Sequence, residues 1–223
     1  MQTRHYWLGL CLSTSIFSAN FAQAAAKEWS FDVYLDKSKI GLHRFTLSDS
    51  NQLVSEANFQ VKFLFINAYQ YQHTSKEQWN NDCLNELDAN TKENKILSSV
   101  SGHLANGQFS LSSNVNEDKK MQSLPECVMT FAYWNPKILK QTRLLNPQNG
   151  DYLYTTFRLI GNEKIDFNGE KKNAKHYHLL AYEAESMSDK PKLNIQLWYD
   201  NNNDWLALKS ITPEGYTISY KRK

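Results

Sequence analysis

The sequence lacks a long apolar run beyond its first 26 residues. An α-helix needs about 20 consecutive apolar residues to span a bilayer, and no later segment approaches that length. This absence excludes a helical membrane protein and leaves a water-soluble domain or a β-barrel for the body of the chain. No Pro-rich, Gly/Ser-rich or single-charge stretch interrupts that body, so we expect one domain without an internal linker.

The sequence also lacks an excess of charge of either sign. It holds 25 Lys and Arg against 23 Asp and Glu, a formal net charge of +2. Basic clusters occur at Lys119-Lys120, Lys171-Lys172 and Lys221–Lys223, but short runs of this kind are typical of solvated turns and tails. We therefore expect no nucleic-acid partner.

Familiar catalytic motifs are missing as well. The chain has no G-x-S-x-G elbow, no H-E-x-x-H helix, no S-x-x-K motif and no phosphate-binding glycine loop. Two carboxylates of a glycosidase-like pair can lie far apart in sequence, so this alternative stays open. The acids considered for it are Glu56, Glu77, Glu86, Asp166 and Glu183, which we interpret as solvated side chains. We expect no cofactor, and an enzyme is the less favoured class.

Two histidines, His176 and His178, are candidate metal ligands. His176 and His178 lie two residues apart on a predicted strand, which places both imidazoles on one face, about 7 Å apart. This spacing suits a metal ion, but no third ligand is identifiable from local spacing. We interpret the pair as polar residues on a strand face and predict no metal site.

The first residues have the organisation of a secretory signal peptide. Arg4 precedes the apolar run Leu8–Phe17, and the small residues Ala22-Gln23-Ala24 follow. The apolar run is about half as long as a membrane-spanning helix. We predict a signal peptide over residues 1–24, cleaved at that point or two residues later, and a periplasmic domain over residues 25–223.

Cysteine is scarce, with three in the whole chain. Cys11 lies in the predicted signal peptide, which leaves Cys83 and Cys127 in an oxidising compartment, so we predict a disulfide between them. In the chain-entropy model a bridge closing a loop of this length stabilises a fold by about 4 kcal/mol. Neither a C-x-x-C spacing nor an adjacent His supports redox or nucleophilic chemistry.

Apolar and polar residues alternate with period two along much of the chain, which is the pattern of half-buried β-strands. Trp29–Leu35, Ala57–Phe65 and Tyr216–Tyr220 are clear examples. Asn106-Gly107 and Asn168-Gly169 suit two-residue hairpins because both residue types accept a positive φ. These features predict a mainly β fold, with a single antiparallel, strongly curved sheet or barrel-like meander of about ten strands.

One short helix is predicted to begin at Asn135-Pro136, because Asn can cap it and Pro suits its first position. It continues through Ile138 and, at its longest, to Leu145. A weaker helical pattern runs from Lys76 to Leu87 but contains Asn80-Asn81-Asp82, so we interpret that segment as a loop.

Aromatic residues are abundant, at 13% of the chain. Most should be core, but a curved sheet can also leave an aromatic-lined cavity for an apolar ligand. The residues predicted to line such a site are Phe63, Phe65, Tyr71, Trp134 and Trp198, with Cys83 and Cys127 holding its flanking loops.

Two segments carry a resemblance to a known family. Phe131-Ala132-Tyr133-Trp134-Asn135, following Cys127, and Leu197-Trp198-Tyr199-Asp200 with the strand Trp205–Ser210 are similar to an uncharacterised family of exported bacterial proteins, domain-of-unknown-function family 6134. The resemblance covers most of the mature chain. It implies a periplasmic β domain and supplies no activity or catalytic residues.

Several classes of function remain. The first is a non-catalytic periplasmic binding or carrier module for a lipid or other apolar ligand. The alternative is a structural or assembly factor of the envelope that binds another protein through an exposed patch or sheet edge. An outer-membrane β-barrel is disfavoured because Lys and Asp interrupt both faces of the predicted strands.

Overall fold

The computed structural model describes residues 26–63, 66–187, 190–212 and 214–223. Most of these residues lie in β-strands, and the described chain also forms one short 3-10 helix, η1. The elements are β1 (Lys27–Leu35), β2 (Ser38–Leu47), β3 (Gln52–Phe63), β4 (Ile66–Asn80), β5 (Cys83–Glu93), β6 (Ile96–Ala105), β7 (Gln108–Val115), β8 (Asp118–Pro125), η1 (Pro136–Lys140), β9 (Arg143–Leu145), β10 (Tyr152–Phe167), β11 (Glu170–Tyr182), β12 (Leu193–Tyr199), β13 (Trp205–Ile211) and β14 (Thr217–Arg222).

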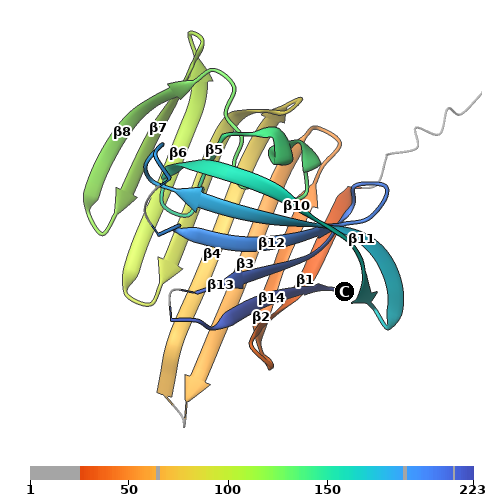
Figure 1. Ribbon diagram of the computed structural model, residues 1–223. Helices are drawn as coiled ribbons and strands as arrows, with labels where there is room; N and C mark the ends of the chain where they lie inside the picture. The colour runs from red at the N-terminus through yellow and green to blue at the C-terminus, as the bar shows by residue number, and fades with distance from the viewer. Residues whose placement is uncertain (1–25, 64–65, 188–189, 213) are drawn as a thin grey trace, which may run out of the picture.

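All strands belong to one 14-stranded sheet with the order β8-β7-β6-β5-β4-β3-β2-β1-β14-β13-β12-β11-β10-β9. Its two halves meet where β1 pairs antiparallel with β14, for example Val33 with Tyr220. β8 and β9 are the edges and do not pair with each other, so the sheet is open. Figure 1 shows β10–β13 crossing in front of β3–β6, so that the two halves of the sheet form two layers.

The predicted mainly β, antiparallel sheet is confirmed, but the predicted number of about ten strands is wrong. The segment Lys76–Leu87 shows the reason. It is not a loop but the end of β4 and the start of β5, joined by a tight turn in which Asn81 has a φ of 54°. Trp79 and Leu84 are buried on either side of that turn. Polar residues in a two-residue connection therefore resemble an irregular segment when they are read without their partner strands.

The predicted turns and helix start agree with the structure. Asn106-Gly107 has φ values of 52° and 74°, and Asn168-Gly169 has 53° and 84°, as tight primed hairpins require. Asn135 caps η1 by accepting a hydrogen bond from the Lys137 backbone N–H at 3.0 Å. The helix ends at Lys140, however, and Leu144 and Leu145 belong to β9. No helix in the described ranges is long and apolar enough to cross a membrane.

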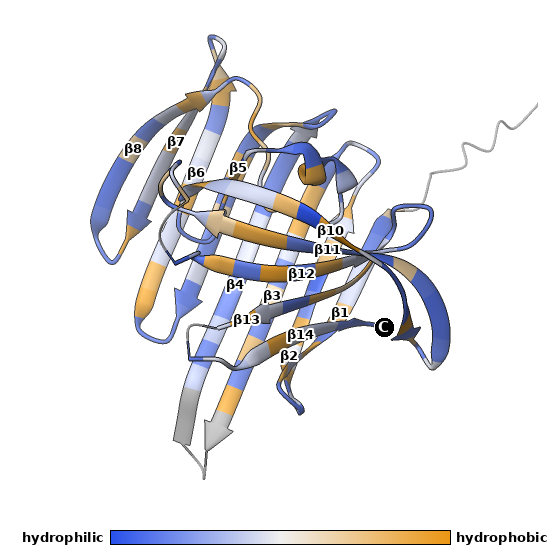
Figure 2. Ribbon diagram, viewed as in Figure 1, coloured by the Kyte–Doolittle hydropathy of each residue, from blue (hydrophilic) through white to orange (hydrophobic). Residues whose placement is uncertain are grey.

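The core lies between the two layers and is filled by alternate residues of the strands. Its main cluster includes Trp29, Phe31, Leu111 and Trp205, each at most 1% exposed. A second cluster continues along the same face toward the β3–β4 turn and consists of Val33, Ile40, Ala57, Phe59 and Tyr71. Figure 2 shows the underlying alternation of hydrophobic and hydrophilic residues along β12.

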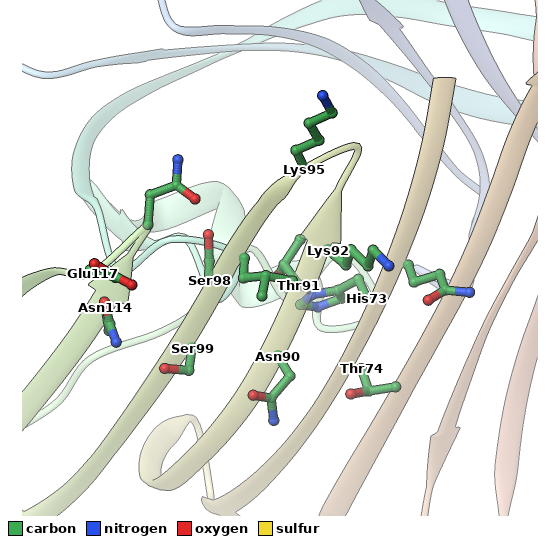
Figure 3. A pocket seen from close by; sticks show the side chains of 13 residues that line it. His73, Thr74, Asn90, Thr91, Lys92, Lys95, Ser98, Ser99, Asn114 and Glu117 are labelled. Carbon is green, nitrogen blue, oxygen red and sulfur yellow. Dashed lines mark hydrogen bonds between the residues drawn. The ribbon is translucent and has the colours of Figure 1, made fainter. Parts of the chain in front are cut away.

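The outer face of β4–β7 is polar. Thr74, Asn90, Ser99 and Asn114 are cross-strand neighbours on this face, because the residues beside them along each strand, such as Ser75 and Val100, are buried in the core. A hollow of about 700 Å³ lies over this row. Figure 3 shows Thr74, Asn90 and Ser99 projecting to the same side of their strands.

β2 and β3 approach each other very closely at Gly41, where a Cβ atom would lie 1.9 Å from the Asn58 carbonyl oxygen. We expect Gly41→Ala to lower the free energy of unfolding by about 3 kcal/mol, because the backbones must separate to admit the methyl group. Gly161→Ala is the matched control, since a Cβ there meets no atom within 4 Å. Urea unfolding of both variants checks the prediction, and equal stabilities would contradict it.

Candidate functional site

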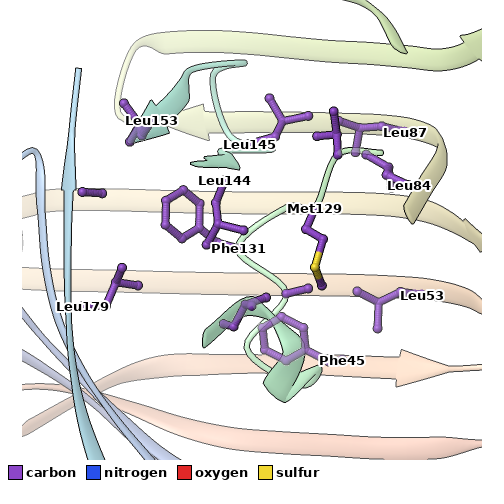
Figure 4. Close-up of a cluster of buried hydrophobic side chains, with 14 of the residues drawn as sticks. Phe45, Leu53, Leu84, Leu87, Met129, Phe131, Leu144, Leu145, Leu153 and Leu179 are labelled. Atoms are coloured by element: carbon purple, nitrogen blue, oxygen red, sulfur yellow. The ribbon is translucent and has the colours of Figure 1, made fainter. Parts of the chain in front are cut away.

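The segment between β8 and β10, residues 126–151, lies inside the fold, and we call it the plug. Its backbone bonds to both layers: the Leu84 N–H of β5 donates to the Val128 carbonyl at 2.8 Å, and the Thr155 N–H of β10 donates to the Thr142 carbonyl at 2.8 Å. Val128, Leu144 and Leu145 are fully buried. Figure 4 shows Met129 and Leu144 among core side chains from both layers. The plug therefore fills one end of the space that the curved sheet encloses.

A disulfide between Cys83 and Cys127 fixes the point at which the plug enters the core. The two Cα atoms lie 4.8 Å apart, and the two residues are separated by 44 positions in the sequence. Cys83 begins β5, next to the β4–β5 turn, and Cys127 precedes the buried run Val128–Ala132. The structure thus contains the disulfide that the two cysteines predict.

Glu77 lies where β4 meets the plug and is 3% exposed. Its carboxylate accepts hydrogen bonds from the Trp79 indole N–H and the Thr130 hydroxyl, both at 3.1 Å. Burial raises the pKa of the Glu77 carboxyl to about 7, because desolvation outweighs the stabilisation of the charged form by these neutral donors.

The interpretation of Glu77 as a solvated acid is therefore wrong. The other acids considered with it, Glu56, Glu86, Asp166 and Glu183, are exposed. Alternation along β4 places Glu77 on the same face as Tyr71 and His73, and this parity is the signal in the sequence that could have identified it as buried.

Two buried histidines, His43 and His73, lie in the core beside the second cluster. The His43 ring nitrogens lie 2.7 Å from the Ser55 hydroxyl and 3.2 Å from the Tyr220 hydroxyl. The His73 Nδ1 atom lies 2.9 Å from the Thr91 hydroxyl. Burial lowers the pKa of His43 well below its usual range and that of His73 to about 4, so both rings are neutral at pH 7. Both ring nitrogens of His43 and the Nδ1 atom of His73 thus have hydrogen-bond partners on other strands.

Three of the residues predicted to line an apolar site, Tyr71, Trp134 and Trp198, do not come together. Tyr71 stacks on Phe59 with ring centroids 5.1 Å apart in the second cluster. Trp134 lies on the plug and packs edge-on against Trp79 at 5.4 Å. Trp198 belongs to a separate cluster with Ala174 and Leu206.

The other two predicted lining residues cannot be placed in the same way. Phe63 is the last residue of β3, and its side chain lies outside the described part of the structure. Phe65 lies outside the described residues altogether. The structure therefore provides three separate packing environments for Tyr71, Trp134 and Trp198.

His176 and His178 face amide side chains of the neighbouring strand. His176 lies against Gln196 and also approaches Glu163 at 3.2 Å, and His178 lies 2.8 Å from Asn194. The His176 ring stacks on Trp198 with centroids 4.5 Å apart. Within the described residues, no three His, Cys, Asp or Glu side chains are grouped as metal ligands.

The outer edge of β10 is a feature that sequence reasoning missed. β9 pairs only with Tyr152–Tyr154, and the Thr155 N–H donates to the Thr142 carbonyl at 2.8 Å. Beyond Thr155, the described chain places no strand against this edge. Leu159 and Ile160 lie here, 54% and 46% exposed, beside a register shift that ends at Gly161. The consecutive Leu159-Ile160-Gly161 in an otherwise alternating run is the sequence signal of this exposed bulge.

The other edge of the sheet has a different chemistry. β8 carries Lys119 and Lys120 and ends at Pro125, residues that oppose further strand pairing. The Gln122 side chain also donates to the Gly150 carbonyl of the plug at 3.0 Å. The uncovered part of β10 also carries charged residues, Arg158 and Lys164 among them, but it has no proline and exposes Leu159 and Ile160, so we take it as the candidate functional site.

Comparisons with known proteins identify a family and a solved structure with a similar fold. The family model described as Domain of unknown function (DUF6134) matches residues 31–223. A solved structure from Brucella abortus, titled as a beta-barrel-like protein of domain of unknown function DUF1849, is similar with a TM-score of 0.62 and 11% identity, covering 89% of this chain and 96% of that chain. At this identity the likeness concerns the fold alone. No curated protein matches the sequence.

The buried carboxyl predicts a dependence of stability on pH. The wild-type free energy of unfolding should decrease relative to that of Glu77→Gln as pH rises from 4.5, the ordinary value, to about 7, because the unfolded carboxyl ionises first. Above pH 7 this decrease should level off, at a total of about 3 kcal/mol relative to the difference at low pH. Both proteins contain His43 and His73, so their contributions cancel.

Urea unfolding at several pH values measures this difference. Glu56→Gln, which neutralises an exposed acid on β3, is the control and should follow the wild type. A wild-type to Glu77→Gln difference that stays constant with pH would show that the pKa of Glu77 is the same in the folded and unfolded states, which contradicts the prediction.

Proposed function

The chain belongs to the DUF6134 family, and we propose that it is an exported, non-catalytic module that binds an extended segment of another protein along the outer edge of β10. Export to the periplasm follows from the predicted signal peptide over residues 1–24. The observation that carries the binding proposal is the uncovered edge from Thr156 to Phe167, with Leu159 and Ile160 exposed.

The physics of a sheet edge supports this proposal. An edge strand presents backbone N–H and C=O groups that an extended segment can pair with, and this pairing supplies affinity. Leu159 and Ile160 are both exposed at the bulge, so they offer apolar contacts to the side chains of an added segment. Both edges carry basic residues, but only β8 contains a proline, Pro125, and this difference favours β10 over the opposite edge.

The placement of the ionisable groups supports a non-catalytic role. Catalytic acids and bases have perturbed pKa values and lie in clefts that substrate can reach. Here the pKa values of Glu77, His43 and His73 are strongly shifted, but all three side chains are at most 8% exposed and bonded to neighbours. Their shifts have a structural cause, which is burial in the core.

A second candidate is a carrier for a lipid or other apolar ligand. It is favoured by the second cluster, which lies at the end of β3 and β4 opposite the plug. Val61, Tyr69 and Ile218 pack against this cluster and are only partly buried. An apolar ligand could extend the cluster there without displacing the plug.

Photocrosslinking tests the edge proposal. We expect a photoreactive benzoylphenylalanine at position 160, introduced in cells that naturally make the protein, to form one discrete covalent adduct with a partner protein. The same residue at Met121, which is 75% exposed on the β8 edge, is the control and should form none. Equal labelling from both positions, or none from position 160, would contradict the proposal.

Native mass spectrometry tests the carrier. If the second candidate is right, protein purified without detergent should carry a stoichiometric apolar adduct that solvent extraction removes. Tyr71→Lys should abolish the adduct, because it places a charge in the second cluster. Trp198→Lys, in the separate cluster with Ala174 and Leu206, should retain it. A clean apo mass for the wild type would rule this candidate out.

A further inference from the structure

The hollow on the outer face of β4–β7 has a floor of short polar side chains. Thr74 pairs with Asn90, Asn90 with Ser99, and Ser99 with Asn114, so the four side chains form a row across four strands. Neighbouring strands lie about 4.8 Å apart, which makes the row about 14 Å long. Lys92 and Leu97 belong to the next row of the same face and form a wall of longer side chains.

The floor has a particular hydrogen-bonding character. Each of its four side chains is uncharged and has a donor and an acceptor. The Asn90 amide N–H donates to the Asp88 carboxylate at 3.4 Å. The Asn114 side-chain oxygen is buried, and none of the described residues donates a hydrogen bond to it. A buried acceptor without a donor is costly, so a bound group that supplies an O–H or N–H would stabilise this site.

We propose that this hollow binds an oligosaccharide that crosses the strands, with one sugar ring over each of the floor positions. A pyranose ring has a length comparable to the strand spacing, and its hydroxyl groups both donate and accept, as the floor side chains do. Leu97 is 60% exposed and offers an apolar contact to a ring face or to an N-acetyl methyl group. This site lies on β4–β7, apart from the β10 edge, and does not depend on the function proposed above.

The experiment is an NMR titration of the wild-type protein with chitotetraose and, separately, with cellotetraose. We expect saturable shifts of the Thr74, Asn90, Ser99 and Asn114 amides, with chitotetraose binding more tightly because of its N-acetyl groups. Asn90→Leu with Ser99→Leu fills the floor at one cross-strand pair. It should weaken binding at least tenfold.

The matched control is Ser101→Leu with Ser112→Leu. This is also a cross-strand pair on the outer face, but it lies in the neighbouring row, outside the hollow. It should bind as the wild type does. Thermal unfolding of both double variants monitors folding, and Ser99→Leu alone replaces the floor variant if that variant unfolds.

Three results would overturn the proposal. They are the absence of saturable shifts with either tetrasaccharide, shifts that map away from the floor residues, and equal weakening by the floor and control variants.

Discussion

The structure depends on the attachment of the plug to both layers of the sheet. An open sheet that bends into two layers exposes its apolar inner face at the ends unless another segment covers it. Residues 126–151 cover one end, because Val128 is bonded to Leu84 of the back layer and Thr142 to Thr155 of the front layer. The disulfide between Cys83 and Cys127 places this segment at the start of β5, so the covalent link and the backbone bonds act at the same point. The layers therefore meet through the plug as well as through the pairing of β1 with β14.

The core also contains buried polar groups, and most of them are satisfied by hydrogen bonds with neutral partners. Thr130 on the plug donates to Glu77, and His43 is held between Ser55 and Tyr220. Neutral partners satisfy hydrogen bonds without compensating a full charge, so desolvation moves each pKa toward the neutral form. The same physical cause thus raises the pKa of Glu77 and lowers that of His43. The shifted pKa values of Glu77 and His43 therefore reflect the burial of these side chains in the core.

Local sequence patterns correctly predicted the features that depend on residues close together in the chain, such as strands and tight turns. Alternation over Trp29–Leu35 gave a strand with its large residues inside, and Asn-Gly pairs gave hairpins with positive φ at both residues. The two remaining cysteines gave the disulfide. Prediction failed at Lys76–Leu87, because a turn rich in Asn and Asp has the same composition as a loop until its flanking strands are paired.

The uncovered edge of β10 was harder to predict, because it is defined by the lack of a neighbouring strand among the described residues. Tyr71, Trp134 and Trp198 are similar in composition and hydropathy, yet they pack in three environments that depend on the face of each strand and on the path of the plug. An uncovered strand edge has no signature in the strand itself. It depends on the length of the next strand, and β9 is short because it belongs to the plug.

The uncovered edge follows from the plug by a further step. The sheet could become a closed barrel only if β8 paired with β9 or β10, but the rest of the plug lies between β8 and β9. Its residue Thr130 pairs in parallel with Leu145 of β9, and Gly150 accepts a hydrogen bond from Gln122 of β8. The seam is therefore filled by the plug as far as Thr155, and β10 continues beyond it to Phe167 with no neighbouring strand on that side among the described residues. The packing that closes the core at one end thus leaves a strand edge free next to it, and a binding partner can use that edge without opening the core.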